Sequence, residues 1–184
     1  MIARDEALAL MESKIANENL RRHMLATEAI MRALASKLGQ DEDLWGLTGL
    51  LHDIDLEEVG DDAGRHAALA AEWLEGQLPA EALQAIRSHN GEQLGIERRA
   101  VLDHALAAAE NLTGLVVAAT LVLPGKRIAD LKAKSVRKRM KEPRFAAGAN
   151  RDIIREAEQV GLELAEFIEI GVEAMRGVGP ELGL

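Results

Sequence analysis

The feature that most constrains the fold is an almost unbroken succession of helix-forming segments. Ala, Leu, Glu, Arg and Lys, which are the strongest helix formers, dominate the 184 residues. The one long β-branched stretch, Val116 to Val122, is embedded in a longer helical pattern, and the single Asn-Gly pair, Asn90-Gly91, lies between helical patterns. The sequence therefore predicts an all-α protein.

Apolar periodicity, caps and helix breakers place the expected helices, within a few residues. Gly39 should end the second helix and Pro124-Gly125 the sixth. A polar loop is expected at 55–64, and a frayed tail at 177–184. No repeat or linker interrupts the chain, so we expect one domain, residues 1–184. The helices are expected at about 5–15, 18–38, 43–53, 65–75, 79–89, 98–123, 128–141, 151–160 and 164–176.

Composition narrows the chemistry that the chain can carry. Hydrophobic residues make up 48 % of it, enough for a core without staples. There is no cysteine, which excludes disulfides, thiolate metal sites and cysteine nucleophiles. Any divalent metal must therefore be held by His, Asp and Glu, a ligand set that suits Fe, Mn, Mg, Co, Ni or Zn.

The N-terminus and the hydropathy of the chain indicate a cytoplasmic protein. Met1 to Leu10 lacks the basic start and apolar core of a secretory signal. We find no stretch of about 18 uncharged apolar residues, so no membrane partner is expected. The net charge of −9 makes nucleic acid an unlikely partner as well. The sequence does not indicate an oligomeric state.

One segment, from Lys126 to Arg144, is strongly basic. Nine basic residues against two acidic ones give it a net charge of +7, so the rest of the chain carries −16. As a lid or wall it could gather a phosphorylated substrate by charge. It could equally be a solvated helix face, or one paired with acidic helices of the same chain. The nine are Lys126, Arg127, Lys132, Lys134, Arg137, Lys138, Arg139, Lys141 and Arg144.

The His52-Asp53 pair follows an apolar helix directly. A carboxylate is poorly placed at a helix C-terminus, and a bound cation would remove that penalty. The alternative is a capping Asp beside an incidental His. His23 falls on the inward face of the second helix, where a hydrogen-bonded core histidine is the other interpretation.

Three more candidates follow along the chain. His66 begins a helix and His89 ends one, where polar helix-end residues are the alternative. Glu110 shares a face with apolar residues on the long sixth helix, so its carboxylate must be paired or metal-bound. His104 points roughly 120° away from Glu110, which predicts a surface or core-edge residue rather than a ligand.

Together these residues form an ordered set of metal ligands, and no phosphate loop, nucleophile elbow or HExxH motif competes with them. The chain resembles the HD superfamily of phosphohydrolases, and most closely its small bacterial and archaeal HDIG-type members, which are predicted hydrolases. The resemblance runs over nearly the whole chain, through "NENLRRHMLATEAIMRALA", "WGLTGLLHDIDLE", "AIRSHNGEQLGI", "AAENLTGLVVAATLV" and "KSVRKRMKEPRFAAG".

The resemblance implies a single-domain HD-type helical bundle with the metal site in its core. About 18–123 would form that core, and about 126–176 the basic helix and the C-terminal helices. The resemblance makes His52, Asp53, His66 and His89 the catalytic residues. It makes His23, His52, Asp53 and Glu110 the ligands of a first metal, with His66 and His89 holding a second metal or the substrate phosphate.

Two departures from the family pattern stand out. Glu110 occupies a position where the family usually has Asp, which puts affinity, metal choice or activity in doubt. Asp55 replaces the Gly of the HDIG motif, and either adds a carboxylate near the metal or caps the loop.

The implied function is a metal-dependent phosphohydrolase, a phosphomonoesterase or phosphodiesterase, acting on a nucleotide or other small phosphoester. One or two divalent ions per chain would activate a water molecule. Lys126, Arg127, Lys134 and Arg137 would bind the phosphorylated substrate. The alternative is a metal-binding sensor or assembly domain with weak or no catalysis, which the change to Glu110 favours.

Overall fold

The structure is a computed structural model that describes all 184 residues, and it contains helices and turns but no strand. The prediction of an all-α fold is therefore confirmed. In chain order the α-helices and two 3₁₀ segments (η) are α1 (Arg4–Lys14), α2 (Glu18–Leu38), α3 (Glu42–Leu51), α4 (Leu56–Val59), α5 (Ala68–Trp73), α6 (Ala80–His89), α7 (Gly91–Leu94), α8 (Val101–Leu121), η1 (Ile128–Asp130), α9 (Ala133–Arg139), α10 (Arg151–Ile154), η2 (Arg155–Val160), α11 (Leu164–Gly177) and α12 (Gly179–Leu182).

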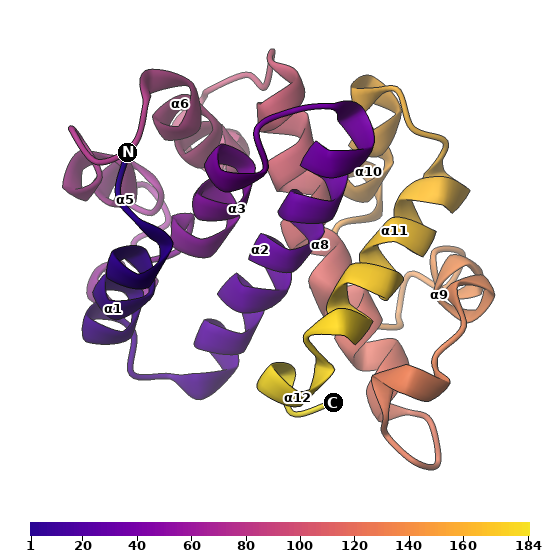
Figure 1. Ribbon diagram of the computed structural model, residues 1–184. Helices are drawn as coiled ribbons and strands as arrows, with labels where there is room; N and C mark the ends of the chain where they lie inside the picture. The colour runs from indigo at the N-terminus through magenta and orange to yellow at the C-terminus, as the bar shows by residue number, and fades with distance from the viewer.

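Two long helices, α2 and α8, form the centre of the bundle. They pack against each other, and both also contact α11. Figure 1 shows α1, α3, α5 and α6 on one side of this pair and α9 and α11 on the other. The buried apolar side chains of both sides join in one cluster. Because α3 contacts α2, α6 and α8, the helices that carry the candidate ligands all border the same core.

Helix α8 would suit a membrane span by length and composition alone. Asp103 and Glu110 interrupt its apolar residues, so the helix contains no stretch of about 18 uncharged apolar residues. Most of the helix is buried inside the bundle, where a core helix needs the same apolar composition.

Local sequence sets the limits of the ligand-bearing helices. The side chain of Asn17 accepts hydrogen bonds from two free backbone N–H groups at the start of α2, and Asp41 does the same for α3. Gly39 ends α2 with a φ of 66°, a left-handed conformation that glycine adopts at little cost. The predicted end of the second helix is confirmed.

Three expectations about local structure were wrong. The predicted loop at 55–64 contains the short helix α4. The basic helix expected over 128–141 is divided into η1 and α9, because Leu131 and Lys132 are extended. The apolar periodicity of this segment nevertheless marks its buried side chains correctly: Ile128, Leu131 and Val136 are all buried.

The third correction concerns the C-terminal tail, which was expected to be frayed. Residues 179–182 instead form α12, which packs against α2 and α11. Pro180 lies in the first turn, where its missing N–H costs nothing, and Leu182 is buried. One apolar side chain with a partner surface outweighs the Gly and Pro content of this segment.

The crossing of α2 and α3 predicts the effect of a substitution at Gly49. A Cβ there would lie 3.0 Å from Met31 Cγ and 3.0 Å from the backbone oxygen of Thr27. We expect Gly49→Ala to destabilise the protein by about 1–3 kcal/mol through overpacking. The matched control is Gly114→Ala within α8, where a Cβ would meet only Ala149 Cβ at 3.9 Å. It should stabilise by about 0.5–1 kcal/mol. Urea unfolding of both variants measures the contrast, and equal shifts would contradict the close packing.

Candidate metal centre

Four imidazole rings surround the carboxylate of Asp53. His23 Nε2 and His52 Nε2 lie 3.5 and 3.4 Å from its Oδ2 atom. His66 Nε2 and His89 Nε2 each lie 3.3 Å from the other oxygen, Oδ1. Asp53 therefore belongs to two triads of potential ligands at once, one with His23 and His52 and one with His66 and His89.

Each ligand comes from a different place in the chain. His23 lies in the first half of α2, and His52 is the C-cap of α3 with Asp53 directly after it. His66 lies in the turn before α5, and His89 is the last residue of α6. Helix packing, rather than a local motif, thus brings the five side chains together.

Backbone carbonyls orient the rings of His52 and His89. The Nδ1–H of His52 donates to the carbonyl of Gly49 at 2.8 Å, and that of His89 donates to the carbonyl of Ile86 at 2.6 Å. A carbonyl oxygen only accepts, so the proton of each neutral ring lies on Nδ1. The lone pair of each Nε2 then points at Asp53, as in a metal-ligating histidine.

Side chains do the same for the other two rings. The hydroxyl of Thr113 donates to the carbonyl of Glu110 at 2.6 Å, so its oxygen accepts from His23 Nδ1 at 2.8 Å. The carboxylate of Asp55 lies 2.9 Å from His66 Nδ1. All four histidines therefore have an outer partner that fixes both the ring and its tautomer.

Asp55 has a structural role as well. It is fully buried, and its Oδ2 accepts the backbone N–H groups of Ala67 and Ala70 at 2.7 and 3.0 Å. Ala67 has a φ of 70°, a conformation that costs a non-glycine residue about 1–3 kcal/mol. Of the two alternatives for Asp55, the structure favours capping. Asp55 caps the start of α5 and orients His66, and it is not in either triad.

Without a cation, the groups of this cluster repel one another. His23 Nε2 and His52 Nε2 lie 3.2 Å apart, and His66 Nε2 and His89 Nε2 lie 3.1 Å apart. When all four rings are neutral, their protons lie on Nδ1. Each of these two contacts then brings together two Nε2 lone pairs, which repel each other and the nearby carboxylate of Asp53. A proton or a metal ion must lie among them, and this donor set fits divalent metal ions.

The pKa values express the same conflict. Burial lowers the pKa of His52 to about 3, and burial also lowers the pKa of His23. Burial acts against His66 too, but hydrogen bonds to Asp53 and Asp55 raise its pKa to about 10. Burial would raise the pKa of Asp53, yet attraction to His52 and a hydrogen bond from His66 hold it well below the usual value.

Glu110 lies near this cluster but in neither triad. Its carboxylate accepts a short hydrogen bond from the side-chain amide of Asn111. Burial, followed by repulsion from Asp53, raises its pKa well above the usual value. The role of Glu110 as a metal ligand stays a prediction.

The remaining candidates lie apart from the cluster. His104 is half-buried, and its Nδ1 lies 2.7 Å from Glu156 Oε2.

Sequence reasoning gave no role to Thr113, which orients His23. Its signal was a hydroxyl on the inward face of an apolar helix, three residues after Glu110.

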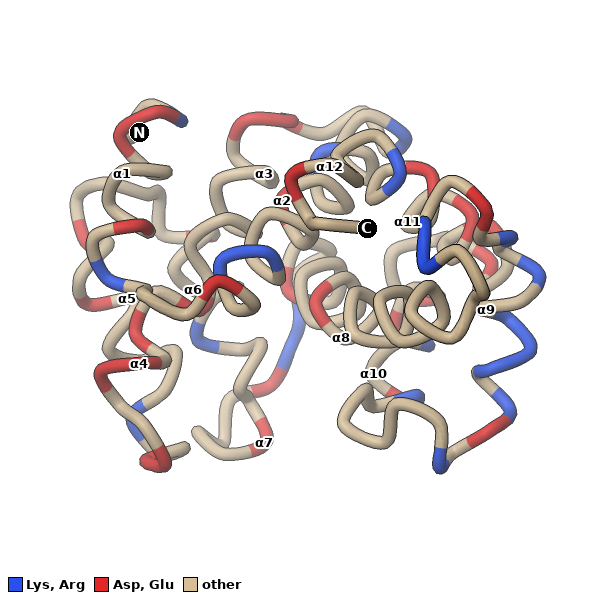
Figure 2. Tube along the Cα trace, turned by 90° about the horizontal axis from the view of Figure 1, so that it is seen from below, with Lys and Arg blue, Asp and Glu red and all other residues tan.

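The predicted substrate-binding residues lie on the surface of the molecule. Figure 2 shows Lys and Arg side by side along and around α9. The only ion pairs of the segment are internal, Arg127 with Asp130 and Arg139 with Glu142. The alternative that acidic helices elsewhere in the chain neutralise this segment is therefore wrong. The four candidates are all exposed: Lys126, Arg127, Lys134 and Arg137.

Comparison with known proteins agrees with this geometry. The HD domain family matches residues 20–121, which is more than half of the chain and includes every candidate ligand. The chain belongs to the HD domain family. It is also 33 % identical over 100 residues to ribonuclease Y of Enterococcus faecalis (strain ATCC 700802 / V583). That match covers 52 % of this chain but only 18 % of the relative. No solved structure matches the chain.

The outer partner of His66 predicts a selective loss of metal affinity. In Asp55→Asn, one amide oxygen can still accept from the backbone, but the amide nitrogen cannot accept from His66 Nδ1. We expect Mn²⁺ to bind about 10–100-fold more weakly at the triad of His66 and His89. Titration calorimetry measures this, with Asp61→Asn, an exposed acid nearby, as the control. Unchanged affinity in Asp55→Asn would show that the contact does not orient the ring.

Proposed function

We propose that this chain is a metal-dependent phosphohydrolase that acts on a nucleotide or other small phosphoester. The observation that supports it best is the carboxylate of Asp53 shared by two pairs of imidazoles, each held at Nδ1 by an outer partner so that its Nε2 faces Asp53. His23, His52 and Asp53 would hold one divalent ion, and His66, His89 and Asp53 would hold a second. Such ions supply an activated water and polarise a phosphoryl oxygen.

The protein residues have separate tasks in this mechanism. Asp53 supplies the negative charge that balances the cations. Thr113, Asp55 and two backbone carbonyls hold the rings, so little reorganisation is needed when metal binds. Four imidazoles to one carboxylate favour Fe, Co, Ni or Zn over Mg, which prefers oxygen ligands.

The substrate that we propose is small rather than a nucleic acid. The name of the similar ribonuclease Y refers to RNA, but the match spans under a fifth of that protein. This chain has two Phe, two Trp and no Tyr, so it offers few side chains on which bases stack. The exposed basic segment supports capture of a phosphate group and does not depend on RNA.

A second candidate function rests on Glu110. Glu110 lies outside both triads, and its side chain is one methylene longer than that of the usual Asp. A metal-binding sensor or assembly domain with weak catalysis would tolerate that change.

Removal of either member of the His-Asp pair tests the catalytic proposal. His52→Ala and Asp53→Ala should each abolish hydrolysis of nucleotides and small phosphoesters supplied with Mn²⁺, Co²⁺ or Ni²⁺. Metal content should fall from one or two ions per chain. The control is His104→Ala, which removes a histidine bonded to Glu156 and should leave kcat and metal content unchanged.

The outcomes separate the two functions. Activity that persists in His52→Ala belongs to another site or to another protein. A wild-type protein that binds no metal contradicts both candidate functions. Metal binding without activity on the whole panel favours the sensor. In that case Glu110→Asp, which restores the usual family residue, should raise activity.

The basic segment predicts an effect on substrate capture. The double variant Lys134→Glu/Arg137→Glu should raise KM several-fold with little change in kcat, because it alters long-range attraction and not the metal centre. The effect should shrink with rising ionic strength. Arg99→Glu, an exposed charge reversal outside the segment, is the control. A KM that does not respond to the double variant would exclude the segment from substrate binding.

A further inference from the structure

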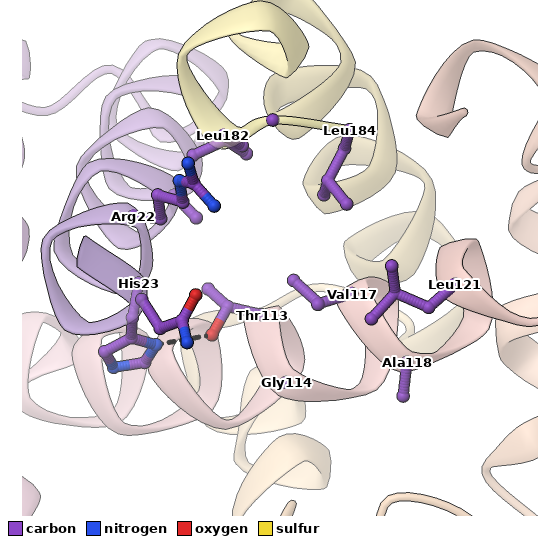
Figure 3. Close-up of a pocket in the computed structure, with 12 residues that line it drawn as sticks. Arg22, His23, Thr113, Gly114, Val117, Ala118, Leu121, Leu182 and Leu184 are labelled. Carbon is purple, nitrogen blue, oxygen red and sulfur yellow. Dashed lines mark hydrogen bonds between the residues drawn. The ribbon is translucent and has the colours of Figure 1, made fainter. Parts of the chain in front are cut away.

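A cavity of about 480 Å³ adjoins the metal centre on the side of His23. That volume lies within the range of small-molecule sites. Figure 3 shows Val117 and Leu121 of α8 on one side of it, and Arg22, Leu182 and Leu184 on the other. No step of the proposed metal chemistry takes place in this cavity.

The cavity borders the candidate metal centre at His23. The ring of His23 lines the cavity, while its Nε2 belongs to the triad with His52 and Asp53. Thr113, which orients that ring, also lines the cavity. The side chain of His23 is 25 % exposed, against 14 % or less for the other four members of the cluster. The most open approach to the cluster is therefore from this side.

The chemistry of the walls favours an aliphatic occupant. Val117, Leu121, Leu182 and Leu184 are aliphatic, and no acidic residue lines the cavity. The polar side chains of the lining besides His23 are Asn19, Arg22 and Thr113, and the hydroxyl of Thr113 is already paired with His23 and Glu110. A sugar would therefore regain few of the hydrogen bonds that it gives up to water. A nucleobase would find no aromatic ring to stack on except the imidazole of His23.

Gly114 is a second observation that favours a ligand here, because α8 carries no side chain at this point of the cavity wall. It lies in the interior of a long helix, where glycine costs about 0.5–1 kcal/mol relative to alanine. It is exposed, and no neighbouring element crowds it, since a Cβ would meet only Ala149 at 3.9 Å. Helix packing thus gives no reason for a glycine here, whereas a ligand lying along the helix does.

We propose that this cavity binds the leaving group of the substrate, and that the leaving group is an aliphatic alcohol. The inference rests on the proposed function. Water forms a new bond to phosphorus, the bond from phosphorus to the ester oxygen breaks, and that oxygen takes up a proton to leave as the alcohol. The phosphate lies at the metal centre and the alkyl chain lies along α8.

A series of n-alkyl phosphates from methyl to octyl, supplied with Mn²⁺, tests this proposal. We expect kcat/KM to rise by about fourfold for each buried methylene until the cavity is full. Val117→Trp fills the cavity and should abolish this dependence on chain length. Gly114→Ala, which should fold well, should reduce it. Val101→Trp, an exposed position at the far end of the same helix, should keep the wild-type series.

The outcomes distinguish this inference from the proposed function. Hydrolysis of every ester at a similar kcat/KM overturns the inference and leaves the phosphohydrolase intact, as does a length dependence that survives in Val117→Trp. If no ester is hydrolysed, calorimetry with non-hydrolysable n-alkyl phosphonates decides. Affinity that rises with chain length and is lost in Val117→Trp supports the cavity, and affinity independent of length overturns it.

Discussion

The structure depends on one buried carboxylate, that of Asp53, placed between four imidazole nitrogens at 3.3 to 3.5 Å. Burying a charge is costly unless it is paired, and neutral rings with their lone pairs turned inward do not pair it. The fold holds this arrangement because each ring is fixed from behind by a partner that accepts from Nδ1. A cation placed among these groups would offset that cost, and the outer partners of the rings hold the donors in an arrangement that fits one.

This constraint explains why the ligands lie at helix ends and on long helices. His52 and His89 donate to a carbonyl three residues earlier in their own helix, an acceptor that becomes free only where a helix ends. His23 instead needs a partner from another helix, and the close packing of α2 on α8 supplies Thr113. The bundle and the cluster thus use the same contacts.

Many of the helices and the order of the candidate ligands could be predicted from the sequence, because both are properties of the chain read along its length. The limits of α2 follow from them, and the convergence of His23 with the His52-Asp53 pair is what the family resemblance implies. The second role of Asp55 could not be predicted, because it depends on the turn at Ala67, whose positive φ no residue preference signals. The state of the basic segment could not be predicted either, because ion pairing depends on which helices are neighbours. The tail was misjudged for a similar reason: Leu182 has a partner surface only when α2 lies beside it.

The C-terminal tail limits what can be inferred from membership of the HD domain family. The matched residues, 20–121, contain every candidate ligand and also Val117 and Leu121 on one wall of the cavity. The opposite wall includes Leu182 and Leu184, which lie outside the match. The candidate ligands are therefore all within the match, whereas the proposed leaving-group cavity is completed by residues outside it. A relative that shares only the matched part shares the ligands without sharing the cavity, so similarity over that part supports the reaction class and not the alcohol that is released.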